Sequence, residues 1–275
     1  MKSLGNIPSA PMYATARVAK LESAVRLVML STATMLLLTL VTIFMVIVAC
    51  ATGFQTQRWL REVVARWFGG AILSIWGIRV ELHQDQPWPS TQVMYISNHT
   101  STLDLFILLS LGLPNTRHFL FRKVRQVIPL GVIGHLIAIF WTGIGYLIGV
   151  FWTCPQDQPA NRVRCFQSAE RVLRRTKESV YVSPEGERVT TGLIGHFNKG
   201  AFHLATNLRV PLVPLYIQIP RSVDPGKGFN ARPGTVHVFI KPSIPTSDWT
   251  LETLESNREA VRNMFVALHE VLRPS

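Results

Sequence analysis

The sequence predicts an α/β domain in which helices flank a mixed, largely parallel sheet, preceded by one long hydrophobic helix. Two observations support this fold class. Short runs with the composition of strands alternate with helical patterns from residue 78 onward. Before them, residues 27–57 contain no charged side chain. We therefore divide the 275-residue chain into a basic arm (1–26), a membrane-anchoring hydrophobic helix (27–56) and a folded domain (57–275).

The hydrophobic segment is almost wholly apolar through Ala51. It is long enough for a tilted membrane helix, because about 20 apolar residues span the core of a bilayer. A cleaved signal peptide is the alternative, but its apolar core is usually about half as long and lies nearer the chain start. We therefore expect a retained membrane helix. Basic residues precede and follow the segment, so the positive-inside rule does not set its orientation.

The residues after this segment combine tryptophan with arginine, namely Trp59, Trp67, Trp76, Arg58, Arg61 and Arg66. This mixture is typical of a helix that lies at a membrane interface, where indole rings and basic side chains both settle. An ordinary core helix is the alternative interpretation. We expect the interfacial one.

Strand candidates lie at 78–82, 92–97, 118–121, 179–183, 211–219 and 234–241. The segment 161–179 has the pattern of an amphipathic helix. A second nearly uncharged run, 126–156, is interrupted by a proline and several glycines. We expect this run to form a helix of the domain that lines an apolar slot or dips into the membrane.

The composition limits the partners. Hydrophobic residues make up 48% and charged residues 16%, which favours membrane association. The formal net charge of +12 favours an anionic partner, but the basic residues are dispersed and match no nucleic-acid recognition module. The three cysteines contain no C-x-x-C pair, so neither a disulfide framework nor a zinc site is expected.

The stretch "ISNHTSTLD" joins a predicted strand to a predicted helix. Ser101 and Asp104 fit an S-x-x-D capping box, which would explain the aspartate without chemistry. His99 lies at the strand end, where side chains of an α/β sheet meet ligands. An imidazole acts as a base when a carboxylate fixes its tautomer and stabilises the cation that forms. Because no G-x-S-x-G motif is present, a substrate hydroxyl would have to serve as nucleophile.

A second polar motif, "SPEGER" at 183–188, directly follows another predicted strand. Gly186 lets the backbone approach a ligand closely, and the planar guanidinium of Arg188 suits a phosphate. A turn with a surface ion pair between Glu185 and Arg188 is the alternative for this motif taken alone.

Together these motifs resemble the glycerolipid acyltransferase family, whose best-known members are the 1-acylglycerol-3-phosphate acyltransferases. The NH-x-x-x-x-D block is here Asn98, His99 and Asp104, and the P-E-G-T-R block is 184–188. "HFNKGAFHLA" resembles the family's F-K-x-G-A-F block, and "VPLVP" at 210–214 resembles its V-P-x-V-P block. Four ordered blocks between residues 90 and 220 make the match specific.

The resemblance implies that His99 deprotonates an acceptor hydroxyl, Asp104 orients His99, and the hydroxyl attacks the thioester of acyl-CoA or acyl-carrier protein. It implies no metal and no other cofactor. The residues expected to bind substrate are Asn98, Ser101, Lys123, Glu185, Gly186, Arg188 and Lys199.

Two positions depart from the family pattern. Cys154 stands where the F-I-x-R block has arginine, and Glu187 stands where threonine usually precedes Arg188. Losing a cation and gaining an anion weakens a phosphate site unless neighbouring basic residues compensate. The resemblance therefore implies acyl transfer to 1-acylglycerol-3-phosphate, with another lysophospholipid, a lyso-aminolipid or glycerol-3-phosphate as alternative acceptors.

The implied protein is a membrane-bound acyltransferase with its catalytic domain facing the cytosol at the inner or cytoplasmic membrane. Its partners would be the bilayer, a lysophospholipid and a soluble acyl thioester. Transfer of acyl groups between phospholipids is a rival activity. The non-enzymatic rival is a membrane lipid-binding protein that retains the motifs only as scaffold.

Overall fold

The computed structural model describes residues 11–53, 55–121, 149–153, 158–224 and 231–272. Its strands are β1 (Ile78–Gln84), β2 (Met94–Ser97), β3 (Thr116–Phe121), β4 (Val150–Thr153), β5 (Ser179–Val182), β6 (Leu212–Gln218) and β7 (Gly234–Ile240). Its helical elements are α1 (Pro11–Ala51), α2 (Gln57–Trp59), the π-helical η1 (Leu60–Val64), α3 (Ala65–Ile75), α4 (Asp104–Leu111), α6 (Pro159–Thr176), α7 (Lys199–Leu208) and α8 (Leu254–Leu272).

The seven strands form one sheet with the order β1-β7-β6-β2-β5-β3-β4. All neighbouring pairs are parallel except β6 and β7, which are antiparallel. β2 and β5 are buried along their whole length, which is usual for a parallel strand covered on both faces. The predicted mixed, largely parallel sheet is therefore confirmed.

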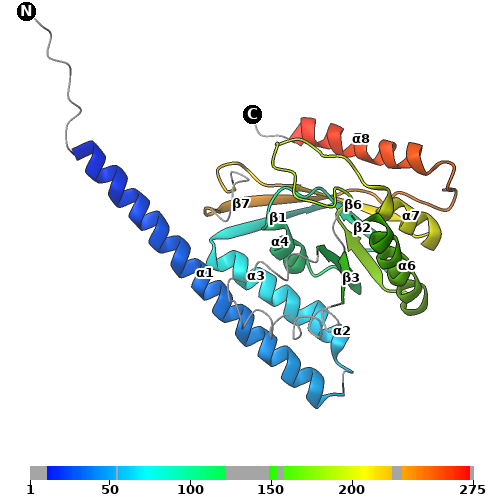
Figure 1. The fold of residues 1–275 in the computed structure, drawn as a ribbon, viewed down its shortest axis with the longest axis horizontal. Coiled ribbons are helices and arrows are strands. Elements are labelled where there is room, and N and C mark those ends of the chain that lie inside the picture. Colours follow the sequence, from blue (N-terminus) through cyan, green and yellow to red (C-terminus); the bar gives the residue numbers. More distant parts are fainter. Residues whose placement is uncertain (1–10, 54, 122–148, 154–157, 225–230, 273–275) are drawn as a thin grey trace, which may run out of the picture.

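Helices cover both faces of this sheet (Figure 1). One core joins α3 and α4 to side chains such as Tyr95 and Leu215. The other joins α6, α7 and α8 to side chains such as Met94 and Ile96. Because successive side chains of a strand point to opposite faces, adjacent residues of β2 belong to different cores. The result is a three-layer sandwich with β2 in its middle.

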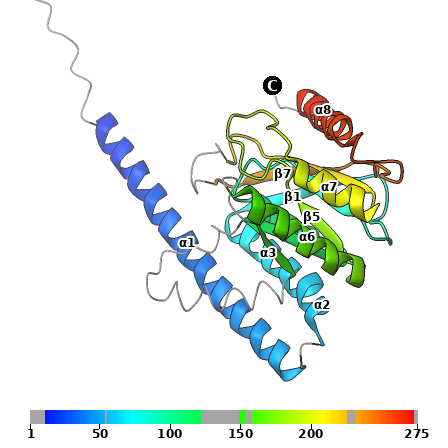
Figure 2. The same ribbon diagram turned by 45° about the vertical axis from the view of Figure 1, so that its right-hand side comes forward.

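Helix α1 runs beside α3 and extends beyond the sandwich (Figures 1 and 2). The indole N–H of Trp76 donates to the hydroxyl of Thr34 at 3.0 Å, and Met45 and Ala49 pack against Leu60. The helix already includes Pro11, well before the predicted residue 27, so residues 11–26 of the predicted basic arm belong to it. The segment Ala24–Ala51 is the only part of the described chain long and apolar enough to cross a membrane.

The tryptophans of 58–78 do not share one environment. Trp59 and Trp67 are 45% and 60% exposed, as expected of an interfacial helix, whereas Trp76 is buried against α1. Gly69 in α3 lets the helix pack closely on α4, since a Cβ there would lie 2.7 Å from the backbone nitrogen of Ser110. Thus α3 is a core helix on one face, and the interfacial prediction is wrong for Trp76.

All six predicted strands are present, with ends that shift by up to two residues. The predicted amphipathic helix at 161–179 is α6. The helix predicted for 126–156 is wrong at its end, because residues 150–153 form strand β4, which pairs with β3 at the sheet edge. The predictions for most of the 126–156 run, including Cys154, fall outside the described residues.

Candidate active site

The candidate site lies at the carboxyl ends of β2 and β5, two neighbouring parallel strands. His99 follows β2 by two residues, and Glu185 follows β5 by three. Because parallel strands present their carboxyl ends at one edge, the two motifs that are far apart in sequence meet there. The backbone N–H of Val189 also donates to the carbonyl of His99 at 2.8 Å, which ties the second motif to the first.

His99 and Asp104 form a hydrogen-bonded pair. The Nδ1 atom of His99 lies 2.8 Å from Oδ2 of Asp104. The aspartate side chain is 2% exposed, whereas the imidazole is 32% exposed. A carboxylate accepts hydrogen bonds, so it selects the tautomer with the proton on Nδ1 and leaves a lone pair on Nε2. Because the imidazole is partly exposed, Nε2 is therefore available to accept a proton.

Asp104 is held by several donors at the start of α4. Its Oδ2 atom also accepts the backbone N–H groups of Thr100 at 2.9 Å and Ser101 at 3.0 Å. These donors, together with the positive end of the helix dipole, favour the negative charge on the carboxylate. The same oxygen therefore both begins the helix and orients the imidazole.

The predicted capping box is only half formed. The Ser101 N–H donates to the Asp104 side chain, as expected, but the Ser101 hydroxyl does not bond to the Asp104 backbone N–H. The hydroxyl instead accepts the Leu103 N–H at 3.0 Å and donates to the carboxylate of Asp224. The chain makes a turn before the helix, so α4 begins at Asp104 and not directly after Ser101.

Glu185 links the second motif to the first through hydrogen bonds with backbone N–H groups. Its Oε2 atom accepts the backbone N–H of His99 at 2.6 Å, and its Oε1 atom accepts that of Gly195 at 2.7 Å. The side chain is buried, and this burial raises the pKa of Glu185 to about 7, although both N–H donors and the nearby His99 oppose the rise. The Glu185 carboxylate therefore holds the backbone at His99 and at Gly195 in position.

Two other residues that were predicted to bind substrate, Asn98 and Ser101, also use their side chains in hydrogen bonds within the protein. The side-chain amide of Asn98 donates to the Ile217 carbonyl at 2.9 Å and accepts the Ile217 N–H at 2.8 Å. The hydroxyl of Ser101 is engaged by Asp224. Both side chains are 2% exposed. We therefore reassign Asn98, Ser101 and Glu185 from substrate contacts to residues that hold the His99 loop in place.

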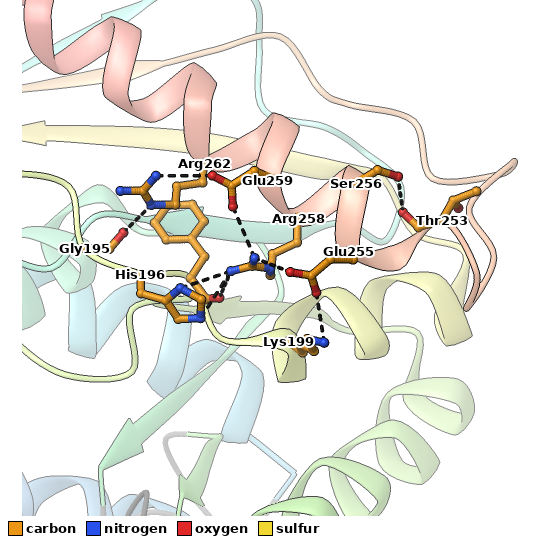
Figure 3. A network of polar contacts seen from close by, with 10 residues as sticks. Gly195, His196, Lys199, Thr253, Glu255, Ser256, Arg258, Glu259 and Arg262 are labelled. Atoms are coloured by element: carbon orange, nitrogen blue, oxygen red, sulfur yellow. Dashed lines mark hydrogen bonds and ion pairs between the residues drawn. The ribbon is translucent and has the colours of Figure 1, made fainter.

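Lys199 lies at the start of α7, and its ammonium group forms an ion pair with Glu255 of α8 at 2.9 Å (Figure 3). Beside it, Arg258 donates to the Phe197 carbonyl at 2.8 Å and Arg262 donates to the Gly195 carbonyl at 2.8 Å. Because the positive charge of Lys199 already has a partner on α8, the structure does not support its predicted role as a substrate contact.

Arg188 remains a candidate substrate contact. It is partly exposed beside the exposed Gly186 and Glu187, and Gly186 has a φ of 73° that favours glycine. Within the described residues its guanidinium makes no hydrogen bond and no ion pair. Lys123, the other predicted phosphate contact, lies outside the described residues.

The family model described as Acyltransferase matches residues 79–218, just over half of the chain. The chain belongs to this acyltransferase family. The matched residues include His99, Asp104, Glu185 and Arg188, so both motifs of the site lie within the family's domain.

Three curated relatives of this acyltransferase share the name 1-acyl-sn-glycerol-3-phosphate acyltransferase. The match to a 1-acyl-sn-glycerol-3-phosphate acyltransferase of Limnanthes alba is 26% identical over 72% of the chain and 66% of the relative. A chloroplastic enzyme of that name from Arabidopsis thaliana is 28% identical over 68% of the chain and 49% of the relative. The human alpha enzyme is 26% identical over 70% and 65%. The chain thus spans about two thirds or less of these relatives' length.

Among solved structures, the acyltransferase fold resembles the 1-acyl-sn-glycerophosphate acyltransferase PlsC from Thermotoga maritima. The TM-score is 0.62, and the match covers 90% of this chain and 98% of that one. At 19% sequence identity this likeness concerns the fold alone.

Sequence reasoning missed several residues that support the site. Gly195, Ile217 and Asp224 contact Glu185, Asn98 and Ser101 from distant parts of the chain. Two of these contacts use backbone groups, which any residue provides, so no side-chain signal marks them. Asp224 follows β6 at the same edge of the sheet as His99, which is a positional signal that could have found it.

Proposed function

We propose that this protein is a membrane-bound O-acyltransferase that moves a fatty acyl group from a thioester to the free hydroxyl of a lysophospholipid. The observation that carries this proposal is the His99–Asp104 pair, with Nδ1 bonded at 2.8 Å and Nε2 open. In the described part of the chain, no serine or cysteine side chain hydrogen-bonds to this imidazole. His99 therefore suits a reaction in which a hydroxyl of the acceptor substrate is the nucleophile.

The reaction follows from this geometry. Nε2 of His99 takes the proton of the acceptor hydroxyl as the oxygen attacks the thioester carbonyl carbon. The new C–O bond forms, the C–S bond breaks, and the departing thiolate takes the proton from the imidazolium. The charge of Asp104 stabilises the imidazolium during transfer. The buried contacts of Glu185 and Asn98 keep the loop fixed, so the base does not have to be ordered at each turnover.

For the acceptor we propose 1-acylglycerol-3-phosphate, which gives phosphatidic acid. The names of the curated relatives support this choice. So does Arg188, whose guanidinium has no partner in the described structure and whose shape suits a phosphate. Glu187, exposed beside it, supports a second candidate, a lysolipid with a cationic amine in its head group.

The donor is an acyl thioester, and no resident cofactor is needed for the transfer. Acyl-CoA and acyl-carrier protein share the reacting thioester and differ only in what carries it. His99, which touches the reacting atoms in our proposal, and Asp104, which orients it, do not distinguish the two carriers.

A panel of acceptors and donors on the purified protein tests the proposal. Radiolabelled 1-acylglycerol-3-phosphate, lyso-aminolipids, other lysophospholipids and glycerol-3-phosphate would each be offered with acyl-CoA or acyl-carrier protein. We expect transfer to 1-acylglycerol-3-phosphate and its loss in His99→Ala. The exposed His203 of α7 provides the matched control, because His203→Ala removes an imidazole outside the site. Equal transfer by His99→Ala and wild type would rule out the dyad and favour a non-enzymatic lipid-binding protein.

We further propose that α1 anchors the enzyme to the membrane with the catalytic domain on the cytosolic side. The helix exposes large apolar side chains over much of its length, namely Val25, Val28, Met29, Met35, Leu36, Leu40, Ile43, Phe44 and Ile47. Such a continuous apolar face is costly in water. A soluble thioester donor supports the cytosolic side. Carbonate extraction of membranes tests the anchor: the protein should stay in the pellet and be released by detergent.

A further inference from the structure

Outside the candidate active site, three side chains with metal-binding atoms converge on one face of the sheet edge. Glu81 and His83 belong to β1, and His237 belongs to the adjacent β7. In the parallel pairing of these strands Glu81 stands opposite His237, and His83 is two residues further along the same face. One ligand atom from each of the three lies within 4.8 Å of the other two.

The contacts in this cluster cannot all be good hydrogen bonds. Nδ1 of His237 lies 3.0 Å from Nε2 of His83 and 3.3 Å from Oε2 of Glu81. If Nδ1 carries a proton, the other two atoms compete for it. If Nδ1 carries none, it presents a lone pair to the carboxylate of Glu81. Neutral imidazoles thus place several lone pairs around one point, which a cation satisfies better than a single shared proton.

Two of the three separations between the ligand atoms are close to those around a transition metal, and the third is within 4.8 Å. Zinc binds imidazole nitrogen at about 2.0–2.1 Å and carboxylate oxygen at about 2.0–2.2 Å, so tetrahedral ligands lie roughly 3.3–3.5 Å apart. The observed 3.0 Å and 3.3 Å are close to this range. We propose that Glu81, His83 and His237 form a binding site for a divalent transition metal of the zinc class. Two imidazoles and one carboxylate suit zinc better than calcium or magnesium, which prefer oxygen ligands.

The ligands are held on rigid strands. The ring of His83 stacks on Phe239 with 4.4 Å between centroids and 11° between planes, which restrains its rotation. Glu81 and His83 are exposed and His237 is partly exposed, so a metal ion reaches the site directly from solvent. Three protein ligands leave one position of a tetrahedral ion for water. Sequence motifs miss such a site because its ligands come from two strands that are far apart in the sequence, and because no ligand is a cysteine.

This site is separate from acyl transfer. Strands β7 and β6 lie between β1 and β2, the strand that leads to His99. A bound metal would therefore not touch the reacting atoms. It would join the edge strand β1, which follows α3, to β7. Because it binds the folded state, the metal should stabilise the protein and slow the release of β1 from the sheet.

Zinc titration of the full-length protein tests the proposal. The protein, purified in detergent without a polyhistidine tag and stripped with a chelator, would be titrated with zinc by calorimetry. Cobalt(II) would serve as the spectroscopic probe, since a tetrahedral ion gives an intense visible absorption band. His237→Ala and His83→Ala remove a ligand each, Glu81→Gln is the mildest change, and His203→Ala is the matched control outside the cluster.

We expect one equivalent of zinc to bind, a rise in Tm, and a visible band with cobalt(II). Outer-shell changes in metal sites weaken affinity by about 10–100-fold, so loss of a ligand in His237→Ala should weaken it at least that much. His203→Ala should bind like the wild type. Acyl transfer without zinc, unchanged in the cluster variants, shows that they fold. A wild type that takes up no zinc, or cluster variants that bind as the wild type does, would overturn the proposal.

Discussion

The carboxylate of Glu185 accepts the backbone N–H of His99 at 2.6 Å, so an acid from one motif fixes the position of the base in the other. The two residues are 86 positions apart in the sequence and meet because β2 and β5 are adjacent parallel strands. Each motif therefore depends on the other for its geometry.

Glu185 should make stability fall as pH rises. Burial raises its pKa from 4.5 to about 7 in the folded state, so folding favours the protonated carboxyl. The contribution of Glu185 is then fully present below about pH 4.5 and is lost as pH rises through about 7. At most one proton is involved, so the slope is up to about 1.4 kcal/mol per pH unit. Urea unfolding of wild type and Glu185→Gln between pH 4.5 and 7.5 measures it.

Glu185→Gln should remove this dependence, because an amide does not titrate in that range. It should also lower the stability at low pH by about 1–3 kcal/mol, since the amide nitrogen cannot accept one of the two backbone N–H groups. The exposed Glu252 offers the control variant Glu252→Gln. The assignment would be wrong if the slope of Glu185→Gln matched that of the wild type.

Asp104→Asn should abolish most activity and leave the fold intact. An asparagine oxygen in place of Oδ2 still accepts the N–H groups of Thr100 and Ser101, and the amide nitrogen takes the place of Oδ1, which has no partner in the described structure. Only the negative charge beside His99 is lost. We expect kcat to fall about 10²–10⁴-fold, the usual size of a general-base contribution.

Acyl transfer with a saturating acceptor measures this change, and circular dichroism checks the fold. Asp85→Asn is the matched control, because Asp85 is an exposed aspartate outside the site. A kcat within a few-fold of wild type for Asp104→Asn would show that the imidazole works without its carboxylate.

The strands were predictable because buried, β-branched runs between turn residues have few other structures open to them. Strand β6, for example, is buried at six of its seven positions. The dyad was predictable because His99 and Asp104 are close in sequence. The roles of Asn98 and Glu185 were not, since their partners are backbone groups of Ile217, His99 and Gly195 that only the fold brings near. Burial distinguishes a residue that supports the fold from one that contacts substrate, and the neighbouring residues in the sequence do not reveal it.

Asn98→Ala should destabilise the protein strongly. The side chain satisfies both the N–H and the carbonyl of Ile217, and the site is buried. Alanine would leave both backbone groups unpaired, at about 1–3 kcal/mol each. We expect a loss of about 2–5 kcal/mol in urea unfolding. Asn207→Ala on the surface of α7 should cost far less. A loss below 1 kcal/mol for Asn98→Ala would mean that water replaces the amide.

Glu187→Thr should reveal the acceptor. If the site takes a phosphate beside Arg188, removing the neighbouring anion lowers repulsion, and KM for 1-acylglycerol-3-phosphate should fall about two- to tenfold at low salt. Arg188→Ala should raise the same KM. Glu187→Gln is the matched control, because it removes the charge and keeps the size. A rise in KM with both Glu187 variants would instead indicate that Glu187 contacts a cationic head group.

Arg262→Ala should slow acyl transfer from a distance. Arg262 donates to the carbonyl of Gly195 at 2.8 Å (Figure 3). It also donates to the carbonyl of Ile194 at 3.2 Å, and the N–H of Gly195 in turn donates to Glu185. Losing the guanidinium frees this loop, so Glu185 loses one of its two donors and holds His99 less firmly. Because the loss reaches His99 only indirectly, and a typical hydrogen bond contributes about 0.5–1.5 kcal/mol net, we expect kcat to fall a few-fold to about tenfold with little change in KM.

Arg262→Lys separates charge from geometry in this prediction. An ammonium keeps the charge but cannot reach both carbonyls with the planar fork of arginine, so its kcat should lie between those of wild type and alanine. Arg171→Ala, at an exposed position of α6, controls for the loss of a surface cation. If Arg262→Lys were as slow as Arg262→Ala, the fork would be required to hold the loop. If both matched wild type, the contacts of Gly195 with Glu185 would be stable without α8.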